Sequence, residues 1–300
     1  MITNWIKKLI SAVLFTLLMA GCTMSFTYNH LDWLIPWYVD DYVDLSRQER
    51  QLLQGQLGPL LQWHREEELE RYLEMLDQVE TDLAGVVSSA QVRSWVEEVI
   101  AAIERVEENM LPVALEFGAS LSDEQLAEFM DSVWEEHRDY EEELLSRTDA
   151  EYVKENRKNL ENFLERFTGR LNDEQEAILQ RAARSLQRFD AVWLEDHERW
   201  LNTLGPLLRR DPGWQASLQE AYANRTRQRT AQYTELLEYN MDVISEAVAV
   251  ILNQLSERQQ KHLDGKIEDL RLLVQRQSQS NRSNRGTDYL TPSLIGGQFT

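Results

Sequence analysis

The stretch Ser122–Arg147, SDEQLAEFMDSVWEEHRDYEEELLSR, is the clearest indication of the fold. Its apolar side chains recur three and four residues apart, which is the spacing of one face of an α-helix. A capping residue, Ser122, precedes the first apolar residue. The sequence therefore predicts an amphipathic helix with one buried face. The residues of that face are Leu126, Phe129, Met130, Val133, Trp134, His137, Tyr140, Leu144 and Leu145.

The remainder of the chain has the same character. Twelve glycines and six prolines interrupt 300 residues, and strand patterns are nearly absent. We expect an all-α, elongated multi-helix bundle, with residues 46–276 as its helical domain. Residues 277–300 are rich in Ser, Asn, Gln and Gly and lack helical periodicity, which predicts a disordered tail. The expected helices cover 46–82 with a bend at Gly58-Pro59, 89–117 bent or shortened by Pro112, 122–147, 149–168, 172–204, 214–254 and 256–275.

Four segments carry a helix-start pattern. Residues 117–125 and 167–175 both read F-x-x-x-L-[S/N]-D-E-Q, and looser versions begin at Leu45 and Leu255. Each is a capping box, in which Ser or Asn caps the first turn and Gln or Glu three residues later bonds back to the capping residue. The capping residues are 76, 50 and 84 residues apart, which is too irregular for a solenoid. The pattern therefore marks helix starts only.

The first 22 residues predict export and lipid attachment. Two lysines within residues 1–8 precede the uncharged run 9–20, the layout of a signal peptide. Met19-Ala20-Gly21-Cys22 then resembles the lipobox of bacterial lipoproteins, which implies removal of residues 1–21 and acylation of Cys22 with several chains, palmitate among them. The alternative is a plain secretory signal with an incidental cysteine. Cys22 is the only cysteine, so no internal disulfide can form. In a Gram-negative cell, Thr23 favours the outer membrane over inner-membrane retention.

The net charge limits the classes of partner. The full chain carries −21, and loss of Lys7 and Lys8 with the signal peptide leaves −21 − 2 = −23. A surface this acidic repels phosphate backbones and anionic lipid head groups, which argues against nucleic-acid binding and a broad electrostatic membrane patch. Acidity that keeps a helical protein soluble is the preferred interpretation, and an acidic docking surface is the alternative.

Aromatic side chains are concentrated in residues 22–45, between the anchor and the helical domain. These rings are candidates for contact with a partner or with the membrane interface, as in aromatic belts. Packing into the body of the protein is the alternative, and it is the interpretation that we prefer. The candidate contact residues are Tyr28, Trp33, Trp37, Tyr38 and Tyr42.

Three segments combine tryptophan, histidine and acids, around His64, His137 and His197. Histidines and carboxylates from separate helices can form a metal site in a bundle. The di-iron spacing needs an acid three residues before each histidine, but those positions hold Leu61, Trp134 and Leu194. We therefore predict no metal and no cofactor, and interpret these residues as partly buried rings beside solvated acids.

Motifs of common enzyme classes are missing from the sequence. It contains no Gly-rich phosphate loop, no His-Glu-x-x-His helix, no Gly-x-Ser-x-Gly elbow and no cysteine pair. We therefore do not expect an enzyme. An enzyme that uses carboxylates and histidines from separate helices stays as the alternative.

The segment 28–42, YNHLDWLIPWYVDDY, followed by Leu45-Ser46 and Trp63-His64, resembles an uncharacterised family of proteobacterial lipoproteins. This resemblance implies envelope location and a helical fold, and it supplies no catalytic residues. A weaker likeness is to periplasmic chaperones whose helices begin Leu-Thr-x-x-Gln. The matches are Leu121-Ser122-x-x-Gln125 and Leu171-Asn172-x-x-Gln175, in which the threonine is replaced, and this chain is much longer than those chaperones.

Together these features predict a lipid-anchored lipoprotein of the outer membrane that faces the periplasm and acts by binding or by organising the envelope. Its expected partners are the membrane, through the N-terminal lipid, and an envelope protein. A chaperone-like or apolar-ligand-binding helical protein is the alternative, and that function would require an apolar cavity with an opening.

Overall fold

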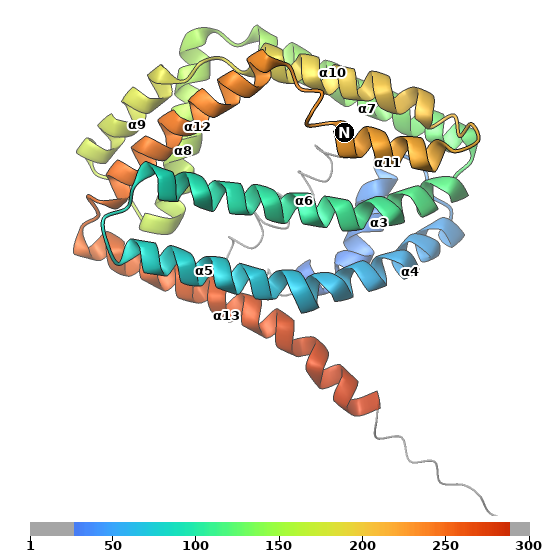
Figure 1. Cartoon of the computed structure of the whole chain (residues 1–300), viewed down its shortest axis with the longest axis horizontal. Helices are drawn as coiled ribbons and strands as arrows, with labels where there is room; N and C mark the ends of the chain where they lie inside the picture. Colours follow the sequence, from blue (N-terminus) through green and yellow to red (C-terminus); the bar gives the residue numbers. More distant parts are fainter. Residues whose placement is uncertain (1–26, 289–300) are drawn as a thin grey trace, which may run out of the picture.

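A computed structural model describes residues 27–288 of the chain, and these residues form helices without a single strand (Figure 1). The all-α prediction is confirmed. The predicted signal peptide, Cys22 and residues 289–300 of the predicted tail lie outside the described residues. The helices are α3 (Leu31–Asp40), α4 (Arg47–Trp63), the π-helix η1 (His64–Glu68), α5 (Leu69–Leu83), α6 (Ser89–Ser120), α7 (Asp123–Ser146), α8 (Asp149–Thr168), α9 (Asp173–Ser185), α10 (Asp190–Leu207), α11 (Trp214–Asn224), α12 (Ala231–Leu252) and α13 (Glu257–Asp288).

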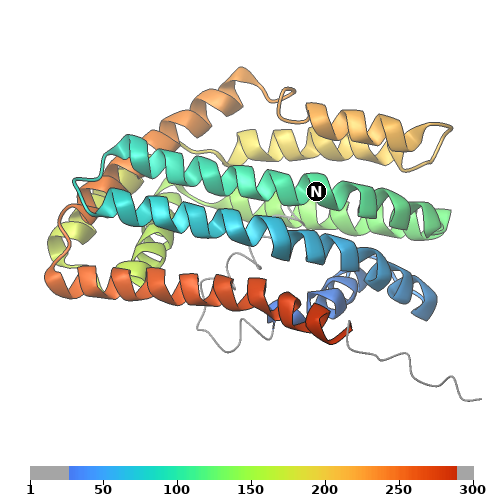
Figure 2. The same cartoon turned by 60° about the horizontal axis from the view of Figure 1, so that its bottom comes forward.

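Helices α5, α6, α7, α10 and α13 run roughly along the long axis of the molecule, whereas α8 and α12 run at an angle to it at one end (Figures 1 and 2). The continuous run α4–η1–α5 lies beside α6 and α13, while α7, α10 and α11 form a second group and α8, α9 and α12 a third (Figures 1 and 2). Each group has its own buried apolar cluster, and α6 contributes apolar side chains to both the first and the second of these clusters. The largest cluster joins α3 and α4 to α6 and to Leu273 and Val274 of α13.

The C-terminal helix is longer than predicted. The predicted boundary between helical domain and tail, at residue 277, falls inside α13, which continues to Asp288. Leu273 and Val274 pack into the core, and the side chain of Gln277 is buried one turn later. Tertiary packing therefore extends the helix past the point where apolar periodicity ends.

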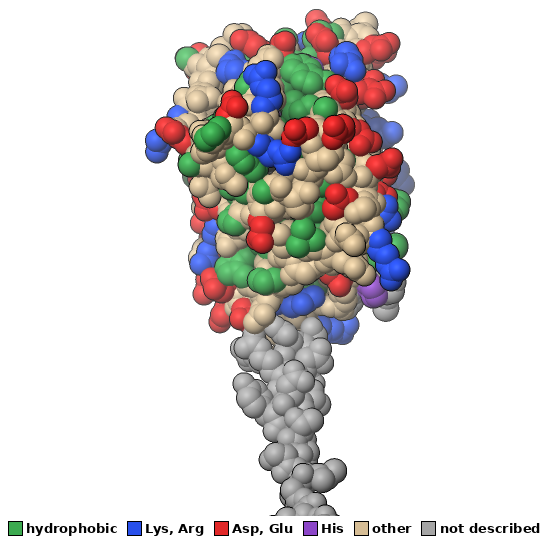
Figure 3. Space-filling model, turned by 90° about the vertical axis from the view of Figure 1, so that its right-hand side faces the viewer, with side chains coloured by type: hydrophobic (Ala, Val, Ile, Leu, Met, Phe, Trp, Pro, Cys, Tyr) green, Lys and Arg blue, Asp and Glu red, His purple; other side chains and the backbone are tan. Residues whose placement is uncertain are grey.

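The surface carries both signs of charge. Figure 3 shows one end of the molecule, on which basic side chains are scattered among acidic and hydrophobic ones. No broad basic face is visible there that could follow a phosphate backbone.

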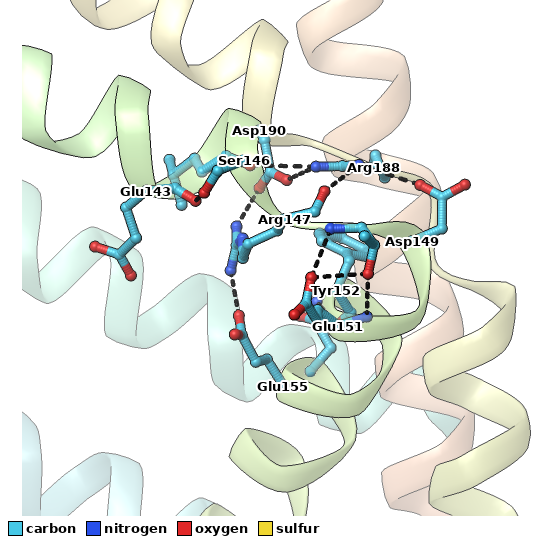
Figure 4. A network of polar contacts seen from close by, with 12 residues as sticks. Glu143, Ser146, Arg147, Asp149, Glu151, Tyr152, Glu155, Arg188 and Asp190 are labelled. Carbon is cyan, nitrogen blue, oxygen red and sulfur yellow. Dashed lines mark hydrogen bonds and ion pairs between the residues drawn. The ribbon is translucent and has the colours of Figure 1, made fainter.

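Two predicted helices are interrupted. The predicted helix 172–204 is broken at residues 186–189, between α9 and α10. There Arg147 Nη2 and Arg188 Nη2 donate to the two carboxylate oxygens of Asp190, at 2.6 and 2.9 Å, and Arg188 Nη1 also donates to the carbonyl of Arg147 (Figure 4). Both guanidinium groups lie over the ring of Tyr152. This network fixes the break through partners about 40 residues away, which is why local sequence gives no indication of it.

The second interruption divides the predicted helix 214–254 into α11 and α12 at residues 225–230. Arg225, the residue that follows α11, pairs with Glu107 of α6. Thr230 then caps α12 by accepting a hydrogen bond from the backbone N–H of Tyr233. By contrast, four prolines lie inside helices and end none of them: Pro36, Pro59, Pro112 and Pro206.

The four capping boxes that the sequence indicates all form. They also meet in pairs. Gln125 Nε2 donates to Glu49 Oε2 at 3.1 Å, so the starts of α7 and α4 lie together. The side-chain amides of Gln175 and Gln259 exchange two hydrogen bonds, of 2.9 and 3.3 Å, in the buried contact between the starts of α9 and α13.

We expect Gln175→Leu to lower the free energy of unfolding by about 1–3 kcal/mol, because it removes the hydrogen bonds that the fully buried amide of Gln175 makes with Gln259, with the backbone N–H of Asn172 and with the carbonyl of Gln254. Gln91→Leu is the matched control, since Gln91 also completes a capping box but lies on a half-buried surface and bonds to Asp82. Urea unfolding of wild type, both single variants and Gln175→Leu/Gln259→Leu measures the coupling. A coupling energy near zero between Gln175 and Gln259 would contradict the pairing.

Candidate functional site

Helix α3 divides the predicted contact residues between two faces. Leu31, Ile35 and Val39 face the core at i, i+4 and i+8. Trp33 and Trp37 lie four residues apart on the other face and are 56% and 58% exposed. Two exposed tryptophans on one short helix form an apolar surface, which we call the Trp33/Trp37 face.

The other aromatic residues of the segment pack into the body. Tyr28 is buried, and Tyr38 and Tyr42 are half-buried with their hydroxyl oxygens 3.2 Å apart. The Tyr42 hydroxyl also donates to Glu136 Oε2 at 3.2 Å and thereby ties the segment to α7. Of the five candidate contact residues, Trp33 and Trp37 are therefore exposed, whereas Tyr28, Tyr38 and Tyr42 pack against the body and hold α3 in place.

A buried cluster at the π-helix fixes the start of this segment. His64 is the first residue of η1, and its two ring nitrogens lie 2.8 Å from the Tyr28 hydroxyl and 3.3 Å from the Tyr72 hydroxyl. Burial lowers the pKa of His64 to about 4, so its imidazole is neutral at neutral pH. Burial also raises the pKa values of Tyr28 and Tyr72. The cluster therefore joins three neutral side chains by hydrogen bonds.

Glu68, the last residue of η1, is fully buried. Arg105 of α6 forms a bidentate pair with it, from Nε and Nη2 at 2.8 and 3.0 Å, and Arg71 Nη1 adds a third bond at 3.2 Å. The sequence interpretation of this run as solvated acids is therefore wrong for Glu68. A π-turn rotates the residues that follow it about the helix axis, so that different side chains point to the core. Such turns are frequent at functional sites. Sequence reasoning missed this pair because Arg105 lies 37 residues away.

His137 and His197 meet between α7 and α10. Their Nδ1 atoms are 2.9 Å apart and both side chains are buried. Trp193 stacks on His197 with ring centroids 5.1 Å apart, and Trp134 contacts His137 edge-on. Burial lowers the pKa of His137. The three histidine segments thus do not converge, since His64 lies in a separate cluster.

Two further observations concern metal ions and membranes. Among residues 27–288, no group of three or more His, Cys, Asp and Glu side chains could hold a metal ion. Within the same residues, no helix combines the length and the apolar character needed to cross a membrane.

Comparison with known proteins identifies the family of this chain. No curated protein and no solved structure matches it. Residues 41–234 match DUF6279, which is described as a family of unknown function, and this match begins near the end of the aromatic segment. The expectation that the chain belongs to an uncharacterised family is confirmed. Because the match covers more than half of the 300 residues, the protein belongs to the DUF6279 family.

Proposed function

We propose that this protein is an outer-membrane lipoprotein, anchored through Cys22 and facing the periplasm, whose Trp33/Trp37 face lies on the membrane and holds the helical body beside it. The exposure of these two rings on α3, while the other aromatic residues of the segment are packed, is the observation that supports the proposal. Tryptophan is enriched at membrane–water interfaces because its ring is apolar and its N–H is polar.

The distance along the chain allows this contact. Trp33 is the eleventh residue after Cys22. A fully extended chain spans at most ~3.5 Å per residue, so Trp33 must lie within about 40 Å of the anchor. A lipid at Cys22 would therefore bring the Trp33/Trp37 face to the same membrane surface that holds the acyl chains.

The charges near α3 favour a membrane of neutral head groups. Asp32 and Asp41 are exposed on or beside α3, while Asp40 is paired with Arg50 at 2.8 Å. Acids this close to the membrane are repelled by anionic lipids. We therefore infer that zwitterionic lipid is the surface to which the Trp33/Trp37 face binds.

With the Trp33/Trp37 face on the membrane, the acidic helical body would be available to bind another envelope protein. This binding is the proposed role of the body, either by itself or in organising the envelope. The body has its own apolar cores and needs no membrane to bury them. Attachment and binding are therefore separate properties of separate parts of the chain. Cys22→Ala is expected to abolish labelling by palmitate without unfolding the body, whereas unchanged labelling would contradict the anchor.

The membrane contact is tested with the mature chain, residues 22–300, coupled through Cys22 to vesicles that contain a maleimide lipid. Because Cys22 is the only cysteine, coupling is specific. We expect brominated acyl chains to quench part of the tryptophan fluorescence, and Trp33→Phe/Trp37→Phe to remove that quenched part. We also expect the quenching to fall as anionic lipid replaces zwitterionic lipid.

The matched control is Phe163→Ala, because Phe163 is a similarly exposed ring, on α8. This substitution should leave the quenching unchanged. Equal quenching in wild type and in Trp33→Phe/Trp37→Phe would show that α3 does not lie on the membrane.

A further inference from the structure

Two buried imidazole rings share one hydrogen in the contact between α7 and α10. His137 and His197 are 60 residues apart in the sequence, and their Nδ1 atoms lie 2.9 Å apart. A neutral imidazole carries one N–H, so one ring donates from Nδ1 while the other accepts at Nδ1 and carries its own hydrogen on Nε2. The bond therefore exists only as long as one of the two Nδ1 atoms has no hydrogen.

Successive protonation affects this bond in two different ways. The first added proton can bind to Nε2 of the donor ring, which leaves the hydrogen bond in place and makes it charge-assisted. A second proton must bind to the accepting Nδ1. Both nitrogens then carry a hydrogen and both rings carry a positive charge, so the rings repel each other and no hydrogen bond can join them. One proton therefore strengthens the contact, and two protons break it.

The charged side chains around the pair belong to α7, α10 and the loop before α12: Arg138, Glu141, Asp196, Glu198, Arg199 and Arg229. The two glutamates are exposed and favour protonation of His137, but burial has the larger influence and lowers its pKa. Asp196 is already paired with the two arginines, at 2.8 and 3.9 Å. Protonation of both rings therefore needs a pH well below the ordinary pKa of histidine.

The histidine pair lies at a boundary along the contact between α7 and α10. On one side, Val133 and Leu201 belong to a buried apolar cluster and are fully buried. On the other side the contact consists of half-buried rings. Trp193 stacks on His197 with ring centroids 5.1 Å apart, and Tyr140 meets Trp193 edge-on at 5.6 Å. The apolar cluster can hold the two helices together after the pair breaks, whereas the rings lose the neighbour against which they pack.

We propose that His137 and His197 form an acid-sensitive latch, which holds α7 and α10 together until both rings are protonated and then lets the Trp193 side of the contact open. Opening exposes the half-buried rings of Trp134 and Trp193, and so creates an apolar surface in acid that is covered at neutral pH. The latch is a response of the helical body to acid, and it does not depend on the proposed membrane contact of α3.

Nuclear magnetic resonance of the ¹⁵N-labelled mature chain tests the latch directly. We expect a scalar coupling between the two Nδ1 atoms across the hydrogen bond at neutral pH. On acid titration, the two rings should take up protons in two steps that are at least about one pH unit apart. The coupling should survive the first step and disappear at the second, together with the upfield shift that the stacked Trp193 ring gives to the hydrogens of His197. Helical circular dichroism should stay unchanged through both steps.

His137→Gln is the decisive variant, because glutamine can bond to Nδ1 of His197 and takes up no proton. With only one ring to protonate, the stacking shift on His197 should persist in acid. His262→Gln is the matched control, because His262 is exposed on α13, and its latch should open as that of the wild type does.

Three results would overturn the proposal. The wild type could show no coupling between the two Nδ1 atoms, or it could lose helical structure before the second proton binds. The third is loss of the stacking shift in His137→Gln at the same pH as in the wild type. The first two are measured on the unaltered chain, so they decide the matter even if the variant does not fold.

Discussion

Replacing Arg225 by methionine is expected to lower the free energy of unfolding by about 3–5 kcal/mol, because it leaves a buried carboxylate without its counter-charge. Arg225 pairs with Oε2 of Glu107, whose side chain is 0% exposed. The Tyr222 hydroxyl donates to the same oxygen at 2.8 Å, and the guanidinium group stacks on the Tyr222 ring. Without Arg225, the carboxylate of Glu107 would keep only this one neutral donor.

A double substitution separates two contributions to the free energy of unfolding: the loss of the ion pair and the presence of a buried carboxylate without a partner. Because replacing both members of a buried ion pair by apolar residues is often nearly neutral, Glu107→Leu/Arg225→Met should recover most of the loss. Urea unfolding followed by circular dichroism gives both values. Arg199→Met is the control, since Arg199 pairs with Asp196 and Glu195 at the partly exposed surface of α10, and this change should cost less than about 1 kcal/mol. An equal decrease in the free energy of unfolding in Arg225→Met and Arg199→Met would show that the buried pair stabilises the protein no more than a surface pair does.

Lowering the pH from about 6.5 to about 4 is expected to remove about 3 kcal/mol of stability through His64 alone. The pKa of His64 is about 4 in the folded protein and 6.5 without burial, so the unfolded chain takes up the proton first. Stability from this group is therefore complete above pH 6.5 and is lost as the pH falls towards 4. The cause is burial between Tyr28 and Tyr72, where an imidazolium ion would lack water.

His64→Gln should flatten this part of the pH profile, because glutamine is uncharged and can still bond to the two tyrosine hydroxyls. The measurement is the difference in unfolding free energy between wild type and His64→Gln at several pH values from 4 to 7. Carboxylates and the other histidines contribute to both proteins and cancel. His262→Gln, at an exposed position, should keep the wild-type slope, and a wild-type slope in His64→Gln as well would contradict the assignment.

The sequence predicts most of the helices and the starts that carry a capping box, because both depend on residues three or four apart, but it misses the starts of α10 and α12. Ser122 and Gln125 show this directly, since the capping box that their spacing predicts forms in the structure. The same reasoning cannot show that Gln175 meets Gln259, because 84 residues separate them.

The candidate site is predictable from the sequence only in composition. The aromatic segment is evident from the sequence. Which of its rings are exposed, as Trp33 is, and which are buried, as Tyr28 is, depends on which side of α3 faces α4. The sequence of one short helix with apolar residues on all sides does not indicate that side. Likewise, Glu68 has the same local sequence context as its neighbours Glu66 and Glu67, and only the tertiary contact with Arg105 distinguishes it from them.

The position of Leu273 and Val274 in the core that begins with Tyr28 and Leu31 has a consequence for how the protein acquires its fold. More than two hundred residues separate Leu31 from Leu273 in the sequence. Without α13, the apolar faces of η1 and α5 would lack one of their covering helices. Completing this core therefore closes a loop almost as long as the chain, and the packing of α13 must offset the chain entropy that this closure costs.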